Sequence, residues 1–243
     1  MTDLVNILPL AFLGTFGDAF EFIFQGFESP LARGEVGGPA EVWDLTVRHV
    51  ALSAAAMAAG LAVALPLGLY LGHRGRGELF AVAAGNAGRA LPELVLIALF
   101  VAFIGTGFTN VMLALSILVV PPVLVNTFVG IRQVDRTTVE AARGMGMSEW
   151  AIAMRVELPL AAPTVMTGVR TGAINVIATA TIAPLGSVLT LGDFILSPNV
   201  YGDAGVVAGA ILVAVLALSV ELGLAGLQSA LTPRGVKLQR ARA

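Results

Sequence analysis

One group of residues whose types and spacing could do chemistry lies between two long apolar stretches. It contains Glu140-Ala141-Ala142, then Gly146, and further on Leu158-Pro159. Several arginines accompany these residues, so the segment is too polar to face lipid. Its small residues would let another protein approach closely. This combination predicts a docking surface for a soluble partner.

A second group consists of polar residues inside apolar stretches. Glu93 stands out, because an ionised carboxylate in hydrocarbon costs several kcal/mol and must face protein or water. It either lines a cavity and meets a cationic group of a solute, or pairs with Arg89 one helical turn away. Arg170 is expected to snorkel or to pair. The uncharged polar residues of this group either line a pathway for the solute or join helices by hydrogen bonds. These members are Asn126, Asn175 and Thr179.

Catalysis by the chain itself is not expected. The only lysine, Lys237, lies near the C-terminus, so the chain cannot contain a P-loop lysine. There is no cysteine, and His49 and His73 stand apart from residues that would complete a metal site or a catalytic triad. An intramembrane enzyme is therefore disfavoured, and no cofactor or metal is expected on this chain.

Composition places these residues in a membrane. Hydrophobic residues make up 57% and charged residues 12% of the 243 positions, against roughly 25% charged residues in soluble domains. Apolar runs of roughly 20 residues match the thickness of a bilayer. We therefore expect an all-α, polytopic transmembrane helical bundle in contact with lipid, without a nucleic-acid partner.

Five apolar runs are the expected core spans of a membrane domain over residues 45–231. The second run contains Leu91-Pro92 and is expected to break there. The fourth begins at Pro163, because proline suits the first turn of a helix. The runs are Leu45–Gly72, Leu79–Ile104, Phe108–Ile131, Pro163–Leu189 and Val206–Leu231. Glycine pairs with small-xxx-small spacing predict close helix packing. They are Gly68/Gly72, Gly168/Gly172 and Gly205/Gly209.

Residues 1–44 are expected to form an apolar or amphipathic helix followed by an external linker. Phenylalanines recur at every fourth position, which would place them in one stripe opposite the polar residues. Such a helix either crosses the membrane as a sixth span or lies in the interface, and both interpretations stay open. The stripe is Phe12, Phe16, Phe20 and Phe24, opposite Asp18, Glu21 and Gln25.

The distribution of charge predicts the orientation of the chain. Basic residues gather in residues 73–76, in the loop over 132–160 and in the tail over 232–243. The alternate connections, Gly105–Asn110 and Thr190–Asp203, contain no lysine or arginine. By the positive-inside rule, the 132–160 loop and the C-terminal tail are expected to be cytoplasmic.

Local signals divide this loop into two short helices. Thr137 and Glu140 have the spacing of a capping box, which would start the first helix. Gly144 and Gly146 would end it.

Ser148 would cap the second helix, and Glu149 in its first turn suits the helix dipole. Leu158-Pro159 would end this helix, because the residue before proline avoids the α region. Adaptable apolar side chains along the loop would suit a partner's groove. They are Met145, Met147, Trp150, Ile152 and Met154.

The loop resembles a known signature. Glu140-Ala141-Ala142, three residues, Gly146, and then Val156 and Leu158-Pro159 resemble the EAA signature of bacterial ATP-binding-cassette importer permeases, with valine where isoleucine is usual. Flanking runs extend the resemblance to the permeases for glycine betaine, choline and carnitine. These runs are Val123–Arg132, Gly168–Thr171, Ala178–Ala183, Leu191–Ile195 and Leu231–Gly235.

This resemblance implies a type I importer permease fold in a bacterial plasma (inner) membrane. It also implies partners: two ATPase subunits that bind ATP and Mg, a second permease subunit, identical or different, and an extracytoplasmic substrate-binding protein. The loop would couple the chain to the ATPases. The coupling residues that the resemblance implies are Glu140, Ala141, Ala142, Gly144, Gly146, Met147 and Trp150.

The implied cargo is an osmoprotectant such as glycine betaine, choline, carnitine or proline betaine. Few aromatic residues lie in the membrane runs, which argues against an aromatic cage in this chain. High-affinity selection would then belong to the binding protein. The run Arg89–Leu94 is more similar to phosphonate-type permeases, so a phosphonate or amino-acid permease is the alternative within the class. An ATP-independent channel or carrier is the alternative outside it.

Overall fold

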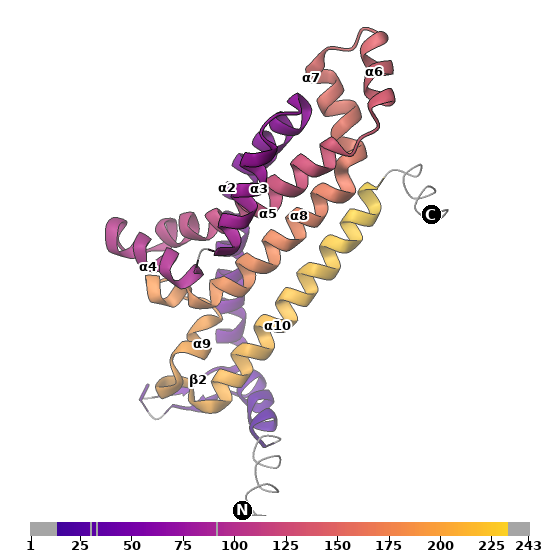
Figure 1. Ribbon diagram of the computed structural model, residues 1–243. Helices are drawn as coiled ribbons and strands as arrows, with labels where there is room; N and C mark the ends of the chain where they lie inside the picture. The colour runs from indigo at the N-terminus through magenta and orange to yellow at the C-terminus, as the bar shows by residue number, and fades with distance from the viewer. Residues whose placement is uncertain (1–13, 30, 33, 91, 233–243) are drawn as a thin grey trace, which may run out of the picture. The chain divides into compact units, whose positions relative to one another are not determined.

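Helices account for most of the structure. The computed structural model describes residues 14–29, 31–32, 34–90 and 92–232 (Figure 1). Its helices are a segment over 14–24, α2 (Gly38–Arg74), α3 (Glu78–Ala90), α4 (Glu93–Ile104), α5 (Phe108–Arg132), α6 (Arg136–Gly144), α7 (Glu149–Ile152), α8 (Leu158–Thr179), α9 (Gly192–Leu196) and α10 (Pro198–Leu231). A π-helical turn, η1 (Ala153–Glu157), precedes α8, and a 3-10 helix, η2 (Ala180–Gly186), follows it. Two short strands, β1 (Phe27–Glu28) and β2 (Glu35–Val36), pair antiparallel.

Within the part of the chain that the structure describes, four helical stretches are long and apolar enough to cross a membrane. They are Gly38–Arg74, Phe108–Arg132, Glu149–Gly186 and Pro198–Ala230. The apolar helix α4 has 12 residues, which at about 1.5 Å per residue reach only part of the way across a hydrocarbon core of about 30 Å. The chain is therefore a multi-pass, predominantly α-helical membrane protein.

The expected break in the second apolar run is confirmed. Helix α3 ends at Ala90 and α4 begins at Glu93, so the helix is interrupted at Pro92, which has no backbone N–H to donate to the preceding turn. Leu91 itself lies outside the described residues.

Two helices begin earlier than the apolar runs indicate. Helix α8 begins at Leu158, before Pro163, and it continues the helical path of α7 through η1. A single Pro163 removes only one backbone donor, which a long helix tolerates. Helix α10 begins at Pro198, well before Val206, and bends at Gly202 with φ 64° and ψ −179°. Glycine is suited to that conformation because it has no Cβ.

The chain divides into two compact units. The first unit comprises Met1–Ala54, Ile97–Met112 and Ile177–Leu218. The second unit comprises Ala55–Leu96, Leu113–Val176 and Ser219–Ala243. Each unit therefore gathers segments that are far apart in the sequence, and each has a core of its own.

Three aromatic rings form the centre of the first unit. Phe22, Phe194 and Tyr201 meet edge to face, with ring centroids 4.9 to 6.2 Å apart. Phe22 and Phe194 are fully buried. The Tyr201 hydroxyl donates to Glu41 Oε1 at 3.0 Å. These rings pack against one another and form a core, not an open cage for a ligand.

The phenylalanine stripe of the N-terminal segment points away from this core. Phe20 and Phe24 are exposed, whereas Ala19 and Phe22 on the same helix are buried. Phe12 lies outside the described residues. The expected amphipathic pattern is thus present over 14–24, and its relation to the membrane stays a prediction.

Glycines allow the helices of the second unit to approach closely. A Cβ on Gly68 of α2 would lie 2.7 Å from Thr127 Cβ on α5. A Cβ on Gly168 of α8 would lie 2.6 Å from the carbonyl oxygen of Pro122, also on α5. Both α2 and α8 therefore contact α5 at positions where no larger side chain fits, as the glycine spacing predicts.

Candidate functional site

The first helix of the 132–160 loop, α6, starts with an aspartate cap. Asp135 is the N-cap, and its carboxylate accepts from Thr137 N at 3.0 Å and from Thr137 Oγ1 at 2.7 Å. These two hydrogen bonds lower the pKa of Asp135 below its ordinary value. The expected Thr137–Glu140 capping box is therefore wrong, because Asp135 precedes Thr137 and satisfies the first turn.

The end of α6 is a Schellman turn around Gly146. Met147 N donates to Ala142 O at 3.2 Å, and Gly146 N donates to Arg143 O at 3.0 Å. Gly146 has φ +85°, a left-handed conformation that favours glycine. The prediction that Gly144 and Gly146 end this helix is confirmed.

The second helix of the loop does not stop where the sequence suggests. Ser148 caps α7 as predicted, accepting from Ala151 N at 3.3 Å. After α7 the backbone passes through the π-helical turn η1 and continues into α8, so Leu158-Pro159 does not end a helix. Pro159 occupies the first turn of α8, a position at which the missing donor costs little. A π-helical turn of this kind often marks a functional segment.

The loop presents an exposed face, which we call the loop surface. Met145 is 77% and Trp150 71% exposed, so two large apolar side chains lie at the surface of an otherwise polar loop. Its residues are Glu140, Ala141, Gly144, Met145, Gly146 and Trp150, all exposed.

Other residues of the loop belong to the core of the second unit. Ala142 is 3% exposed and Ile152 is fully buried, and Met147 packs against the same cluster. The expectation that Ile152 offers surface to a partner is therefore wrong, because it fills the chain's own core. Ala142 and Met147 pack in the core that supports the loop surface. The buried core residues beneath the loop include Leu69, Ile131, Val139 and Val165.

A charged network lies between the loop and the end of α2. Arg143 of α6 forms a bidentate pair with Glu149 of α7, at 2.7 and 2.9 Å, and this carboxylate raises the pKa of Arg143. His73, in the last turn of α2, lies 3.1 Å through Nε2 from Glu149 and 2.5 Å through Nδ1 from Glu157. Glu157 is fully buried in η1.

Sequence reasoning missed this network. His73 and Glu157 are 84 residues apart, so no local spacing connects them. The available signals were a glutamate directly before Leu158-Pro159 at the start of an apolar run, and a histidine at the end of a span.

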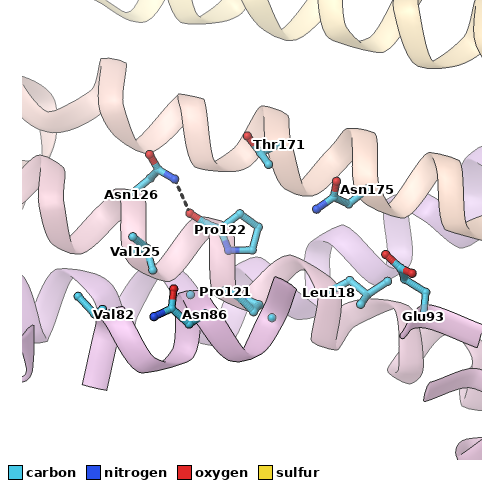
Figure 2. A pocket seen from close by; sticks show the side chains of 12 residues that line it. Val82, Asn86, Glu93, Leu118, Pro121, Pro122, Val125, Asn126, Thr171 and Asn175 are labelled. Carbon is cyan, nitrogen blue, oxygen red and sulfur yellow. Dashed lines mark hydrogen bonds between the residues drawn. The ribbon is translucent and has the colours of Figure 1, made fainter. Parts of the chain in front are cut away.

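A cavity of about 290 Å³ lies among α3, α4, α5 and α8 of the second unit (Figure 2). Its polar lining comes from Asn86, Glu93, Asn126, Thr171 and Asn175. Pro121 and Pro122 form part of the wall where they interrupt the hydrogen bonds of α5. The close contact of Gly168 with Pro122 brings α8 against this wall.

The cavity gathers three of the four predicted pathway residues. Glu93, Asn126 and Asn175 line it, whereas Thr179 belongs to the first unit and is not among the lining residues. Asn126 Nδ2 donates to Pro122 O on its own helix at 2.8 Å (Figure 2). The side chain of Arg89 lies outside the described residues, so its pairing with Glu93 stays a prediction. The described lining residues carry one carboxylate and no cationic side chain.

Arg170 does not face the cavity. Its Nη1 donates to Gln228 Oε1 at 2.7 Å, and its Nη2 donates to Glu221 Oε1. Gln228 in turn donates through Nε2 to Pro163 O at 2.7 Å. The pairing interpretation of Arg170 is therefore confirmed, with its partners on α10.

The fold is shared with a transporter of known structure. A chain of the methionine ABC transporter MetNI, solved in inward-facing conformations, superposes with a TM-score of 0.67 at 19% sequence identity. The match covers 79% of this chain and 94% of that chain. This likeness supports the expected type I importer permease fold.

Two curated relatives match over most of their length. The carnitine transport permease protein OpuCB of Listeria monocytogenes is 37% identical, over 80% of this chain and 90% of the relative. The choline transport system permease protein OpuBB of Bacillus subtilis is 36% identical, over 79% of this chain and 89% of the relative. Residues 64–234 match the family described as binding-protein-dependent transport system inner membrane component. This chain therefore belongs to the binding-protein-dependent transport system inner membrane component family.

Proposed function

We propose that this chain is the membrane-spanning permease subunit of an ATP-driven importer for osmoprotectants. The observation that carries the proposal is the near full-length match to permeases named for carnitine and for choline. A third relative, from Bacillus subtilis, is named for glycine betaine, carnitine and choline and is 34% identical over 79% of this chain. The proposed cargo is therefore a small solute with a quaternary ammonium group.

The energy for transport would come from ATP hydrolysis by other subunits. The chain contains a single lysine, far from any glycine-rich loop, so ATP and Mg would bind to two partner ATPases. Their docking site would be the loop surface, with Met145 and Trp150 as apolar anchors. A second permease subunit would complete the membrane domain, and an extracytoplasmic binding protein would deliver the solute.

Packing beneath the loop supports rigid coupling. Ile152 of α7 and Ala142 of α6 share one buried core with Leu69 of α2 and Val165 of α8. Close-packed cores transmit displacement with little compression. A loop moved by ATPase closure would therefore carry the attached helix ends with it. In this arrangement the loop and the C-terminal tail face the cytoplasm, in agreement with the positive-inside rule.

The chemistry of the cavity favours a cationic cargo over an anionic one. Glu93 is the only titratable side chain among the described lining residues, and the amides of Asn86, Asn126 and Asn175 provide neutral polar contacts. A carboxylate attracts an ammonium group and repels a phosphonate. The phosphonate alternative is disfavoured for this reason. Without an aromatic residue in the lining, the cavity would hold its cargo weakly, which suits a site that must release it.

The direct test is uptake by the reconstituted complex. Proteoliposomes containing this chain with its ATPase and binding protein should accumulate labelled choline, carnitine or glycine betaine only when ATP is supplied to the ATPase side. Equal uptake by vesicles without ATP would favour a channel or carrier. Uptake of a phosphonate but of none of these three solutes would contradict the proposed cargo.

A pair of tryptophans tests the docking surface. Trp150 is 71% exposed on the loop surface and Trp43 is 70% exposed on α2, so removal of either ring leaves the chain's core intact. Trp150→Ala should weaken ATPase association by roughly 30-fold, as expected for a hot-spot aromatic. Trp43→Ala should leave it unchanged. Equal association of both variants with the ATPase would reject the loop surface as the docking site.

A further inference from the structure

The side chain of His73 connects two parts of the loop that otherwise have different surroundings. Its Nε2 lies 3.1 Å from Glu149 Oε2, and Glu149 stands beside Trp150 at the exposed end of the loop. Its Nδ1 lies 2.5 Å from Glu157 Oε2, which has no solvent exposure. One ring on α2 therefore reaches both the outer rim and the buried interior of the loop.

Each ring nitrogen of His73 faces a carboxylate oxygen. A neutral imidazole has a donor on one nitrogen and a lone pair on the other. That lone pair would face one of the two carboxylates, whereas an imidazolium presents a donor to each.

Other charged groups around His73 are less well placed to replace it. Arg136 of α6 is the second cation near Glu157, but its Nη1 lies 3.9 Å from Oε1, beyond hydrogen-bond distance. Glu157 Oε1 has no hydrogen-bond partner among the described residues. Arg143 is directed to the outer carboxylate, Glu149. Glu157 thus depends on His73 for its one strong contact.

We infer that His73 is a positioning residue that fastens the loop to the end of α2 and passes movement of the loop surface to that helix. This inference rests on the proposed function, because it concerns the coupling of ATP hydrolysis to uptake. A change at Trp150 displaces the neighbouring Glu149, and the link through His73 carries this displacement to α2 and to Glu157 in η1. The shared apolar core holds the loop in place, and the ionic link makes α2 follow its motion.

The test compares uptake per ATP hydrolysed in the reconstituted complex, with choline as the probe. His73→Ala should lower this ratio about tenfold, the order of effect expected when a hydrogen bond to a charged group is lost. His73→Arg should restore much of it, because a guanidinium donates to two carboxylates at once. Arg74→Ala is the matched control. Arg74 is the next residue of α2, exposed, and lies over the Tyr70 ring at 5.5 Å outside the network.

A second variant separates coupling from folding. His73→Ala leaves the Glu157 carboxylate buried without its cation, so the complex is also made with His73→Gln and Glu157→Gln together. This pair removes the buried carboxylate together with the imidazole, so no unpaired charge is left buried while the link to α2 is lost. It should assemble normally and still show the reduced ratio of uptake to hydrolysis.

Three results would overturn the inference. The first is a normal ratio of uptake to hydrolysis in the double glutamine variant. The second is an equal fall of this ratio in Arg74→Ala. The third is failure of both His73→Ala and the double glutamine variant to assemble, which would make the residue purely structural. A wild-type complex that hydrolyses ATP without moving choline, carnitine or glycine betaine would instead reject the proposed function itself. The two failures are therefore distinguishable.

Discussion

Glu157 and Glu93 are two carboxylates of the same unit in opposite surroundings. Glu157 is fully buried and held at 2.5 Å by His73. Glu93 is exposed at the start of α4 and borders a cavity of about 290 Å³ lined by amides. Buried charges are stable only when they are paired, whereas a charge beside a cavity remains available to a solute.

The same contrast extends to the neighbouring polar groups. Around Glu157 and Glu149 the charged groups contact one another, so the loop is held as one body. Around Glu93, Asn126 donates to a carbonyl oxygen of its own helix, whereas the side chains of Asn86 and Asn175 make no hydrogen bond to another described residue. The polar groups around Glu157 hold the loop to α2, whereas those around Glu93 remain available to a solute. Mutations in the first should therefore affect both stability and the coupling of ATP hydrolysis to uptake, whereas mutations in the second should affect transport with little effect on stability.

The largest effect is expected at His73. His73→Leu removes the partner of a buried carboxylate, which typically costs about 3–5 kcal/mol of unfolding free energy. Thermal and denaturant unfolding of the purified chain in detergent would measure the loss. Arg74→Leu, at an exposed neighbouring position, serves as the control. Equal stability of the two variants would show that the loop is not held by this network.

A smaller effect is expected where the cavity wall meets α8. A Cβ on Gly168 would lie 2.6 Å from Pro122 O, so Gly168→Ala forces α8 away from α5. This change should lower the free energy of unfolding by about 1–3 kcal/mol. Gly172, one turn further along, has 3.5 Å to its nearest neighbour, Val119, which is an ordinary contact. Gly172→Ala should therefore be neutral or slightly stabilising in the same unfolding assay. A reversed order would contradict the packing of α8 on α5.

The turn between α6 and α7 should respond to backbone conformation alone. Gly146 has φ +85° with open space around it, so Gly146→Ala introduces strain without a clash, at about 1–2 kcal/mol. Gly144 also has open space but lies within α6. Gly144→Ala should therefore gain a little helix propensity. Circular dichroism during thermal unfolding would distinguish the two variants, and an equal response would contradict the left-handed turn.

The smallest effect on stability, with a clear effect on transport, is expected at Glu93. Glu93→Gln should change the unfolding free energy by no more than about 0.5 kcal/mol, as for an exposed site. Choline uptake at low concentration should fall roughly tenfold through loss of one charge-assisted contact. Glu78→Gln, at the exposed start of α3 and outside the cavity, should change neither quantity. A stability loss at Glu93 comparable to that of His73→Leu would erase the contrast between the two carboxylates.

Much of the architecture could be predicted because its signals are local. Apolar length identifies α2, α5 and α10, Pro92 identifies the break before α4, and Ser148 and Gly146 identify the limits of the short helices. Each of these features depends on a few neighbouring residues. Family resemblance then added the fold, whereas the role of the loop in coupling stays a prediction.

The features that the sequence did not predict have a different physical origin. Two aspartate oxygens at Asp135 compete successfully with the threonine hydroxyl at Thr137 for the helix cap. Helical conformation continues through Pro159 because the π-helical turn η1 precedes it, and this turn has no simple sequence signal. His73 looked isolated because its partners come from residues 149 and 157. Tertiary packing decides such features, and a single sequence does not record it.

The ion pair between Arg170 and Glu221 has a consequence for biosynthesis. Arg170 emerges from the ribosome 51 residues before its carboxylate partner, an interval of roughly 3–10 s at about 5–20 residues per second. During that time α8 carries an unneutralised cation, which must remain near the lipid headgroups or be held by the insertion machinery. Completion of α10 supplies both Glu221 and Gln228. Helix α8 therefore reaches its final depth in the membrane only after α10 has been synthesised.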